Sequence, residues 1–136
     1  MAKTISGKAG KVQTGATPVD VADVASWSIT ISYEIGTFAS SSTSKHKDRV
    51  VGVGDSTGTI KVWQQDDVAP GLTVGAEVAV VFDLDGTNAN KYTGSIVIES
   101  FDGYDVDMDT GGAVSANYKW GQAGKLTAAG IVPALT

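Results

Sequence analysis

The sequence predicts an all-β fold, namely a β-sandwich or partly closed barrel of about six to eight antiparallel strands with at most one short helix. Apolar and hydroxyl side chains alternate with a period of two, no segment has sustained helical periodicity, and the 17 glycines fit many tight turns. With 136 residues, 42% of them hydrophobic, the chain is long enough to bury one core. We therefore expect a single domain over 1–136, with an extended loop at about 36–58 and a short C-terminal tail.

The clearest predicted strand extends from Ser26 to Tyr33. Its apolar residues, which alternate with serine and threonine, are Trp27, Ile29, Ile31 and Tyr33. Successive side chains of a strand point to opposite faces, so this segment has one buried apolar face and one hydroxyl face. A helix would scatter the same apolar residues around its axis.

Further segments repeat the alternation or are rich in β-branched residues: 11–13, 19–24, 59–65, 77–84, 91–101 and 114–120. Between two of them, Asp85-Gly86 is typical of a hairpin turn, because glycine readily adopts the positive φ that the turn requires. Pro70 and Gly71 limit any helix in the segment 66–75 to one short turn.

The segment 36–58 departs from this pattern and predicts a long loop, which is a common place for function. It holds a basic group inside a chain of net charge −5. Such a group indicates contact with an acidic surface of a neighbouring subunit, the other interpretation being a solvated loop. The candidate inter-subunit contact residues of this loop are Lys45, His46, Lys47, Arg49 and Asp55.

The residues that carry chemistry predict no catalytic, metal or cofactor site. The chain has one histidine and no cysteine, and His46 has no nucleophile in a recognisable setting. The glycines of 52–58 are not followed by a helix, as a phosphate-binding loop requires, and 83–88 lacks the spacing of a calcium loop. Asp105, Asp107 and Asp109 would share one face of an extended strand and could bind a hard cation, although a solvated face accounts for them equally well.

The acidic balance and the absence of long apolar segments limit the partners. A net charge of −5 disfavours binding to nucleic acid phosphates, so no sequence-specific nucleic acid binding is expected. No segment approaches the roughly 20 apolar residues of a membrane helix, and the first residues do not form a signal peptide. We expect a soluble protein that is made inside the cell.

Taken in order, the segments resemble the tail tube proteins of long-tailed phages over about residues 7–127. The phrases that carry the resemblance are 22–29 (ADVASWSI), 55–60 (DSTGTI), 72–80, 91–100 (KYTGSIVIES), 114–120 (VSANYKW) and 124–127 (GKLT). Members of that family usually carry a helix packed on the sandwich, for which this chain offers little material.

The resemblance implies a non-enzymatic virion protein that is assembled in the host cytoplasm. Its subunits would close into rings, commonly hexameric, that stack into a hollow tube around the DNA path, with copies of itself and other virion proteins as partners. The resemblance also implies that the loop over 36–55 reaches a neighbouring subunit. Two alternatives remain open: a related head decoration or cement protein that clamps capsid subunits, and a carbohydrate- or cell-surface-binding β-module that uses Trp27, Trp63 and Trp120.

Overall fold

The computed structural model describes residues 10–15, 19–20, 24–39, 46–66 and 71–135. These residues form eight strands, all paired antiparallel, and no helix, which confirms the all-β prediction. Consequently no helix in the described ranges is long and apolar enough to cross a membrane. The strands are β1 (Lys11–Thr14), β2 (Val19–Asp20), β3 (Val24–Phe38), β4 (Asp48–Trp63), β5 (Glu77–Asp83), β6 (Lys91–Asp105), β7 (Ser115–Gln122) and β8 (Thr127–Ala129).

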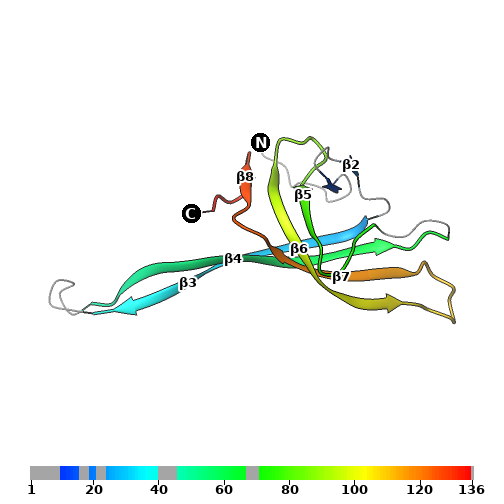
Figure 1. Cartoon of the computed structure of the whole chain (residues 1–136), viewed down its shortest axis with the longest axis horizontal. Helices are drawn as coiled ribbons and strands as arrows, with labels where there is room; N and C mark the ends of the chain where they lie inside the picture. Colours follow the sequence, from blue (N-terminus) through cyan, green and yellow to red (C-terminus); the bar gives the residue numbers. More distant parts are fainter. Residues whose placement is uncertain (1–9, 16–18, 21–23, 40–45, 67–70, 136) are drawn as a thin grey trace, which may run out of the picture.

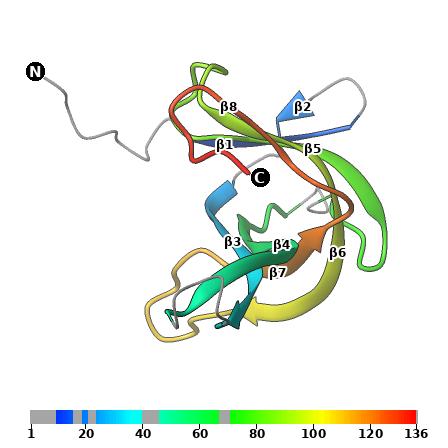
Figure 2. The ribbon, with the colours of Figure 1, turned by 90° about the vertical axis from the view of Figure 1, so that its left-hand side faces the viewer.

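The strands form one continuous sheet that folds over on itself without closing. Its order is β2-β1-β5-β6-β7-β4-β3, and β8 pairs with β6. The long strand β6 belongs to two layers, because Lys91–Val97 pairs with β5 whereas Ile96–Asp105 pairs with β7. Figure 2 shows β6 curving from the upper layer (β1, β2, β5 and β8) to the lower layer (β3, β4 and β7). The predicted sandwich or partly closed barrel is confirmed.

An aromatic stack at the centre joins the two layers. Phe82 of β5 lies 5.1 Å from Trp27 of β3 and 4.9 Å from Trp120 of β7, measured between ring centroids. Phe82 and Trp120 are fully buried. The apolar residues that surround them are Val12, Ile60, Val62, Val80, Tyr92, Ile96, Ile98, Ala116, Tyr118, Leu126 and Val132. Trp27, Ile29 and Ile31, which the alternation assigns to the buried face of the segment 26–33, pack against this core.

The turn after β5 is built around a buried carboxylate. Asp83 accepts hydrogen bonds from the backbone amides of Asp85 (3.2 Å), Gly86 (2.9 Å) and Asn88 (2.8 Å). Gly86 has a φ of 79°, which confirms the predicted turn at Asp85-Gly86. The three amides compensate for removing the carboxylate from water, and they hold the turn at the top of the upper layer.

The long loop predicted at about 36–58 is wrong. β3 continues to Phe38 and β4 begins at Asp48, so that most of this segment is a two-stranded ribbon, drawn in cyan and green in Figure 1. Gly52 and Val53 of β4 lie opposite the single residue Glu34, a bulge that interrupts the alternation. Neither face of the ribbon is buried. Its sequence therefore does not need apolar residues at every second position, which is the pattern that predicts a strand.

Candidate assembly surface

The lower layer is a four-stranded sheet in the order β3-β4-β7-β6, and both of its outer strands have unpaired edges. β3 ends the sheet, with no described strand beyond it. On the side of β6 that faces away from β7, pairing ends near Ile98, whose amide and carbonyl bond Ala76 and Gly75. From Ser100 to Asp105 no described strand pairs with that side. Unpaired backbone groups at two edges are a template for pairing with further strands.

The two unpaired edges run in opposite directions. β3 is antiparallel to β4, β4 to β7, and β7 to β6, so β3 and β6 are themselves antiparallel in direction. If a second copy is placed beside the first by rotation about an axis along the strands, its β6 edge meets β3 antiparallel. The antiparallel order of strand directions then continues from one copy into the next.

The outer face of the lower layer is polar and rich in hydroxyl groups. The Ser28 and Thr59 hydroxyls, on adjacent strands, lie 2.8 Å apart and share a hydrogen bond. The other hydroxyl residues of this face on β3 and β4 are Ser26, Thr30, Ser32 and Thr57. Cross-strand partners point to the same face, so β3 and β4 present a row of short, neutral, hydrated side chains. Further along the same face, the Lys61 ammonium lies 5.4 Å from the centre of the Trp63 ring.

One end of the lower layer extends as the β3–β4 arm, which we define as residues 33–38 and 48–54. Only β3 and β4 pair here, because β7 meets β4 no earlier than Thr57. The Tyr33 ring lies over Gly54 so closely that a Cβ at this glycine would strike it. Beyond this pair, the arm exposes apolar side chains on both faces: Ile35, Phe38, Val50, Val51 and Val53.

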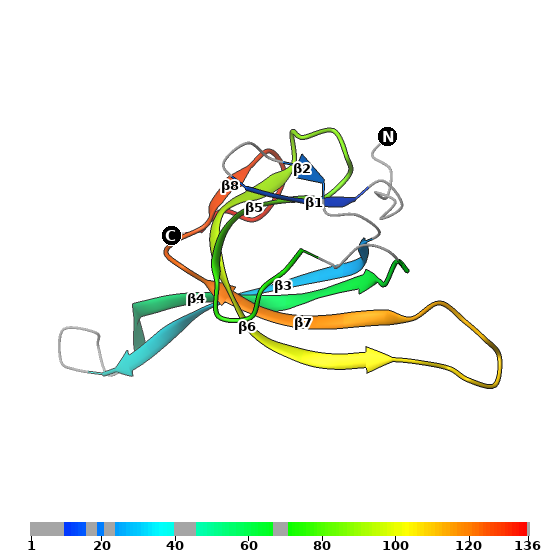
Figure 3. The same cartoon turned by 45° about the vertical axis from the view of Figure 1, so that its right-hand side comes forward.

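The opposite end extends as the β6–β7 arm, defined as residues 101–115 (Figures 1 and 3). Its exposed apolar residues are Phe101, Tyr104, Val106 and Met108, and its acidic residues are Asp102, Asp105, Asp107 and Asp109. The two arms therefore differ in charge. The sequence 33–54 has Lys45, Lys47 and Arg49 against Glu34 and Asp48, whereas 101–115 contains acidic residues and no basic one.

The acidic residues of the β6–β7 arm do not form the predicted strand face. β6 ends at Asp105, and the Asp107 carboxylate caps a turn by accepting bonds from the Asp109 amide (3.0 Å) and the Thr110 hydroxyl (2.6 Å). The Thr110 hydroxyl, together with the Thr110 and Asp109 amides, holds the pKa of Asp107 below its usual value. No group of three residues capable of binding a metal ion occurs in the described ranges.

The candidate contact residues are only partly brought together. Lys45 lies outside the described residues, whereas His46 and Lys47 are exposed in the connection between β3 and β4, and Arg49 follows at the start of β4. Asp55 pairs with Ser32 and lies about 20 Å from Arg49 along the strand, at roughly 3.3 Å per residue. His46, Lys47 and Arg49 are thus at the end of the arm, and Asp55 is on the hydroxyl-rich face.

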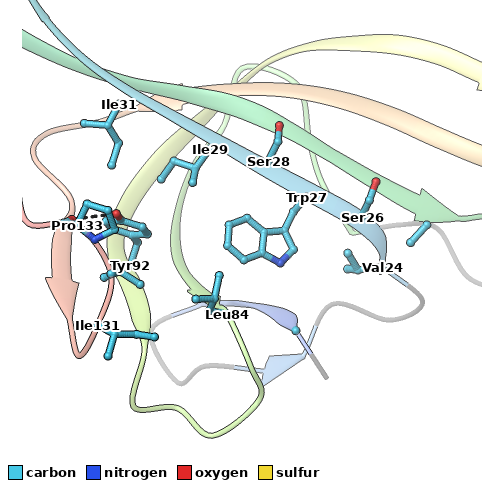
Figure 4. A pocket seen from close by; sticks show the side chains of 13 residues that line it. Val24, Ser26, Trp27, Ser28, Ile29, Ile31, Leu84, Tyr92, Ile131 and Pro133 are labelled. Atoms are coloured by element: carbon cyan, nitrogen blue, oxygen red, sulfur yellow. Dashed lines mark hydrogen bonds between the residues drawn. The ribbon is translucent and has the colours of Figure 1, made fainter. Parts of the chain in front are cut away.

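An open groove lies between the layers along the inner side of β3 (Figure 4). Its volume is about 1030 Å³. Trp27, Ile29 and Leu84 point toward it, whereas the Ser26 and Ser28 hydroxyls point away. On the far wall the Tyr92 hydroxyl donates to the Pro133 carbonyl (2.9 Å), and burial raises the pKa of Tyr92. The groove is apolar and opens beside the unpaired edge of β3.

Sequence reasoning did not identify which strands have unpaired edges, or that the aromatic residues Phe101 and Tyr104 are exposed. Phe101 is out of phase with the alternation of Ile96 and Ile98, because a bulge between Ile98 and Ser100 shifts the register of β6. What exposes these rings is the point at which the upper layer ends, and no local pattern encodes that point.

Solved structures share this fold, although the sequence matches no protein-family model and no curated protein. A chain in the virion of a native gene transfer agent particle aligns with a TM-score of 0.65 and 16% identity, covering 93% of this chain and 100% of that one. A chain in the tail of an empty gene transfer agent particle, with C6 symmetry, aligns at 0.66 and 16%, with the same coverage. The SPP1 tail tube aligns at 0.65 and 15%, covering 95% of this chain and 81% of that one. The chain thus has a tail-tube-like fold.

Proposed function

We propose that this protein is a non-enzymatic structural subunit of a phage-type virion that joins to copies of itself to form rings, and that the rings stack into a tube. The observation that carries the proposal is the lower layer, whose two unpaired edges run in opposite directions. The tail-tube-like fold supports it, since the solved chains that share the fold belong to particles described as virions, tails and tail tubes.

Ring closure gives a physical reason for the open edges. An unpaired edge in solution exposes amide and carbonyl groups to any other strand, which is an aggregation hazard. Pairing the β3 edge of one copy with the β6 edge of the next satisfies both edges. A head-to-tail contact of this kind closes when the rotation per copy divides a full turn, and it then leaves neither edge of the lower layer exposed.

The hydroxyl-rich face is suited to line the tube. In a closed ring of lower layers, one face of the sheet turns outward and bears the upper layer, and the other turns toward the axis. The face turned toward the axis carries the short neutral side chains of β3 and β4. This face also carries Asp55, Lys61 and Lys119, so its few charges nearly balance. A nucleic acid passing through would therefore meet a mostly neutral, hydrated wall that binds its phosphates weakly.

We further propose that the ends of the two arms connect successive rings. Of the basic group, His46, Lys47 and Arg49 lie at the end of the β3–β4 arm, and the acidic β6–β7 arm projects from the opposite end of the molecule. Stacked rings would bring these ends together with opposite charge. The contact weakens as salt is added, because exposed charges are screened over about 10 Å at 0.1 M ionic strength. Asp55 is too far from the basic group to join this contact and instead belongs to the proposed lining.

The test is to image the purified full-length protein by electron microscopy and to measure its mass by sedimentation over a range of concentration and salt. Rings or tubes are the expected result. A Lys47→Glu/Arg49→Glu variant should keep rings and lose stacking, whereas Lys61→Glu/Lys119→Glu, a charge reversal of the same size on the broad face, serves as the matched control. A protein that stays monomeric at high concentration in every salt would overturn the proposal, and binding to empty phage heads without self-association would favour the decoration role.

A further inference from the structure

The groove between the layers is bordered by an unpaired strand edge. Of its lining residues, Trp27 and Ile29 come from the lower layer, and Leu84 and Ile131 come from the upper one. Backbone atoms of β3 form the rim. A strand that paired with β3 would therefore form the missing wall of the groove, and its inward-pointing side chains would enter it.

The other unpaired edge of the same layer carries aromatic side chains without a cover. Phe101 pairs with Tyr118 and Tyr104 pairs with Ala116, and both partners are buried on the inner face. Phe101 contacts Tyr104 and Tyr118 at centroid distances of 5.0 and 5.2 Å, so all three rings share that face. Phe101 is nevertheless 39% exposed and Tyr104 is 53% exposed. Such a pair of exposed rings is the usual content of an interface core.

The aromatic residues and the groove lie at the same level of the sheet. Following the cross-strand partners, Trp27 is opposite Ile60, Ile60 is opposite Tyr118, and Tyr118 is opposite Phe101. A parallel series joins Val24 to Tyr104 through Val62 and Ala116. The groove along β3 and the exposed rings on β6 thus occupy matching heights at the two edges of one layer.

We infer that the groove is half of a binding site, which a second copy of this chain completes by inserting Phe101 and Tyr104. The inference rests on the proposed function, because β6 of the second copy must pair with β3. If the two strands are shifted along each other by an even number of residues, the inner faces of both copies stay on the same side of the sheet. The aromatic side chains of Phe101 and Tyr104 then enter the groove. The site is incomplete in a single subunit.

Charge permits this approach. From Val24 to Tyr33 the β3 edge carries no charged residue. Asp102 and Asp105 of the incoming strand therefore face hydroxyl and apolar side chains, with no like charge directly opposite. The contact joins an apolar groove to exposed aromatic rings, and its rim is formed by neutral hydroxyl groups.

The experiment uses two variants, each of which damages one half of the site. Ile131→Glu places a charge in the groove at a side chain that is 68% exposed, so the subunit should still fold. Phe101→Ala removes the inserted ring. Each variant alone should associate at least about tenfold more weakly than the unaltered protein, as expected for a residue at the centre of an interface.

Mixing the two variants distinguishes the inference from a general folding defect. Phe101 of the groove variant can still enter the intact groove of the Phe101→Ala variant, so an equimolar mixture should form a one-to-one dimer that grows no further. Sedimentation velocity measures this, and circular dichroism checks each fold. Phe38→Ala, which removes a ring of similar exposure (44%) from the other arm, should leave side-by-side pairing unchanged.

Several outcomes would overturn the inference. Phe101→Ala protein that associates as strongly as the unaltered protein would do so, and so would a mixture that gives no dimer. If the groove instead held the first nine residues of its own chain, deleting residues 1–9 would lower the melting temperature of the monomer while the groove variant associated normally. Unaltered protein that never associates would overturn the proposed function itself.

Discussion

The sandwich body and the two arms are built from the same strands but differ in what covers them. In the body, β3, β4 and β7 lie under the upper layer, and the stack of Trp27, Phe82 and Trp120 fills the space between. In the arms, the same strands continue past the upper layer, and their apolar residues are exposed. The difference separates two roles, since the body supplies the free energy of folding and the arms and edges supply surfaces for other chains.

The largest difference between these regions should appear when a large side chain is removed from each. Trp120→Ala empties the centre of the body and should lower the free energy of unfolding by about 3–5 kcal/mol. Phe38→Ala in the β3–β4 arm should change it by no more than about 0.5 kcal/mol, because 44% of this residue is already exposed and no upper layer covers it. Denaturant unfolding of the dissociated subunit measures both. Equal losses would mean that the arm is covered within a single chain.

A smaller effect is expected from adding one methyl group in each region. At Gly58, a Cβ would strike the Ser28 carbonyl and lie 2.8 Å from the Trp120 ring, so Gly58→Ala should cost about 1–3 kcal/mol. At Gly36 in the arm, the nearest atom to such a Cβ is the Val50 carbonyl oxygen at 3.9 Å. Gly36→Ala should be neutral or stabilising by about 0.5 kcal/mol, since alanine loses less backbone entropy. Thermal unfolding of the two variants tests the contrast.

Removing a hydroxyl group should change the stability of the fold in opposite directions on the two faces of β3 and β4. The Ser56 hydroxyl is buried and has no hydrogen-bond partner among the described residues, so Ser56→Ala should stabilise the fold by up to about 1 kcal/mol. Ser28→Ala on the outer face removes the bond to Thr59 and should destabilise slightly. A clear loss of stability in Ser56→Ala would show that this hydroxyl is hydrogen-bonded in solution.

The smallest expected effect concerns protonation at the β6–β7 arm. The pKa of Asp107 is lower in the folded protein than its ordinary value of 3.8, mainly because the Thr110 hydroxyl bonds the carboxylate. The capped turn is therefore fully stabilised above that value and loses the contribution as the pH falls through the lower folded pKa. Carboxyl NMR titration should show this, and Thr110→Val, which lacks the hydroxyl donor, should raise the pKa toward the ordinary value. An unchanged pKa in that variant would exclude this cause.

The sequence predicts the body well because burial leaves a periodic pattern there. β3 turns one face to the core, so Trp27, Ile29 and Ile31 recur at every second position. The β3–β4 arm was mistaken for a loop because neither of its faces is buried and because Gly52 and Val53 form a bulge opposite Glu34. The groove and the open edges depend on where one layer ends over another, which is set by tertiary packing and not by local pattern.

The passage of β6 through both layers links the two halves of the body mechanically. Its first part bonds β5 and β8, and its second part bonds β7. If either layer separates, β6 is released, and the backbone pairing of the other layer is lost with it. The body should therefore melt in one cooperative transition, and amide protons at the bend near Ile96 and Ile98 should be among the slowest in the chain to exchange with solvent.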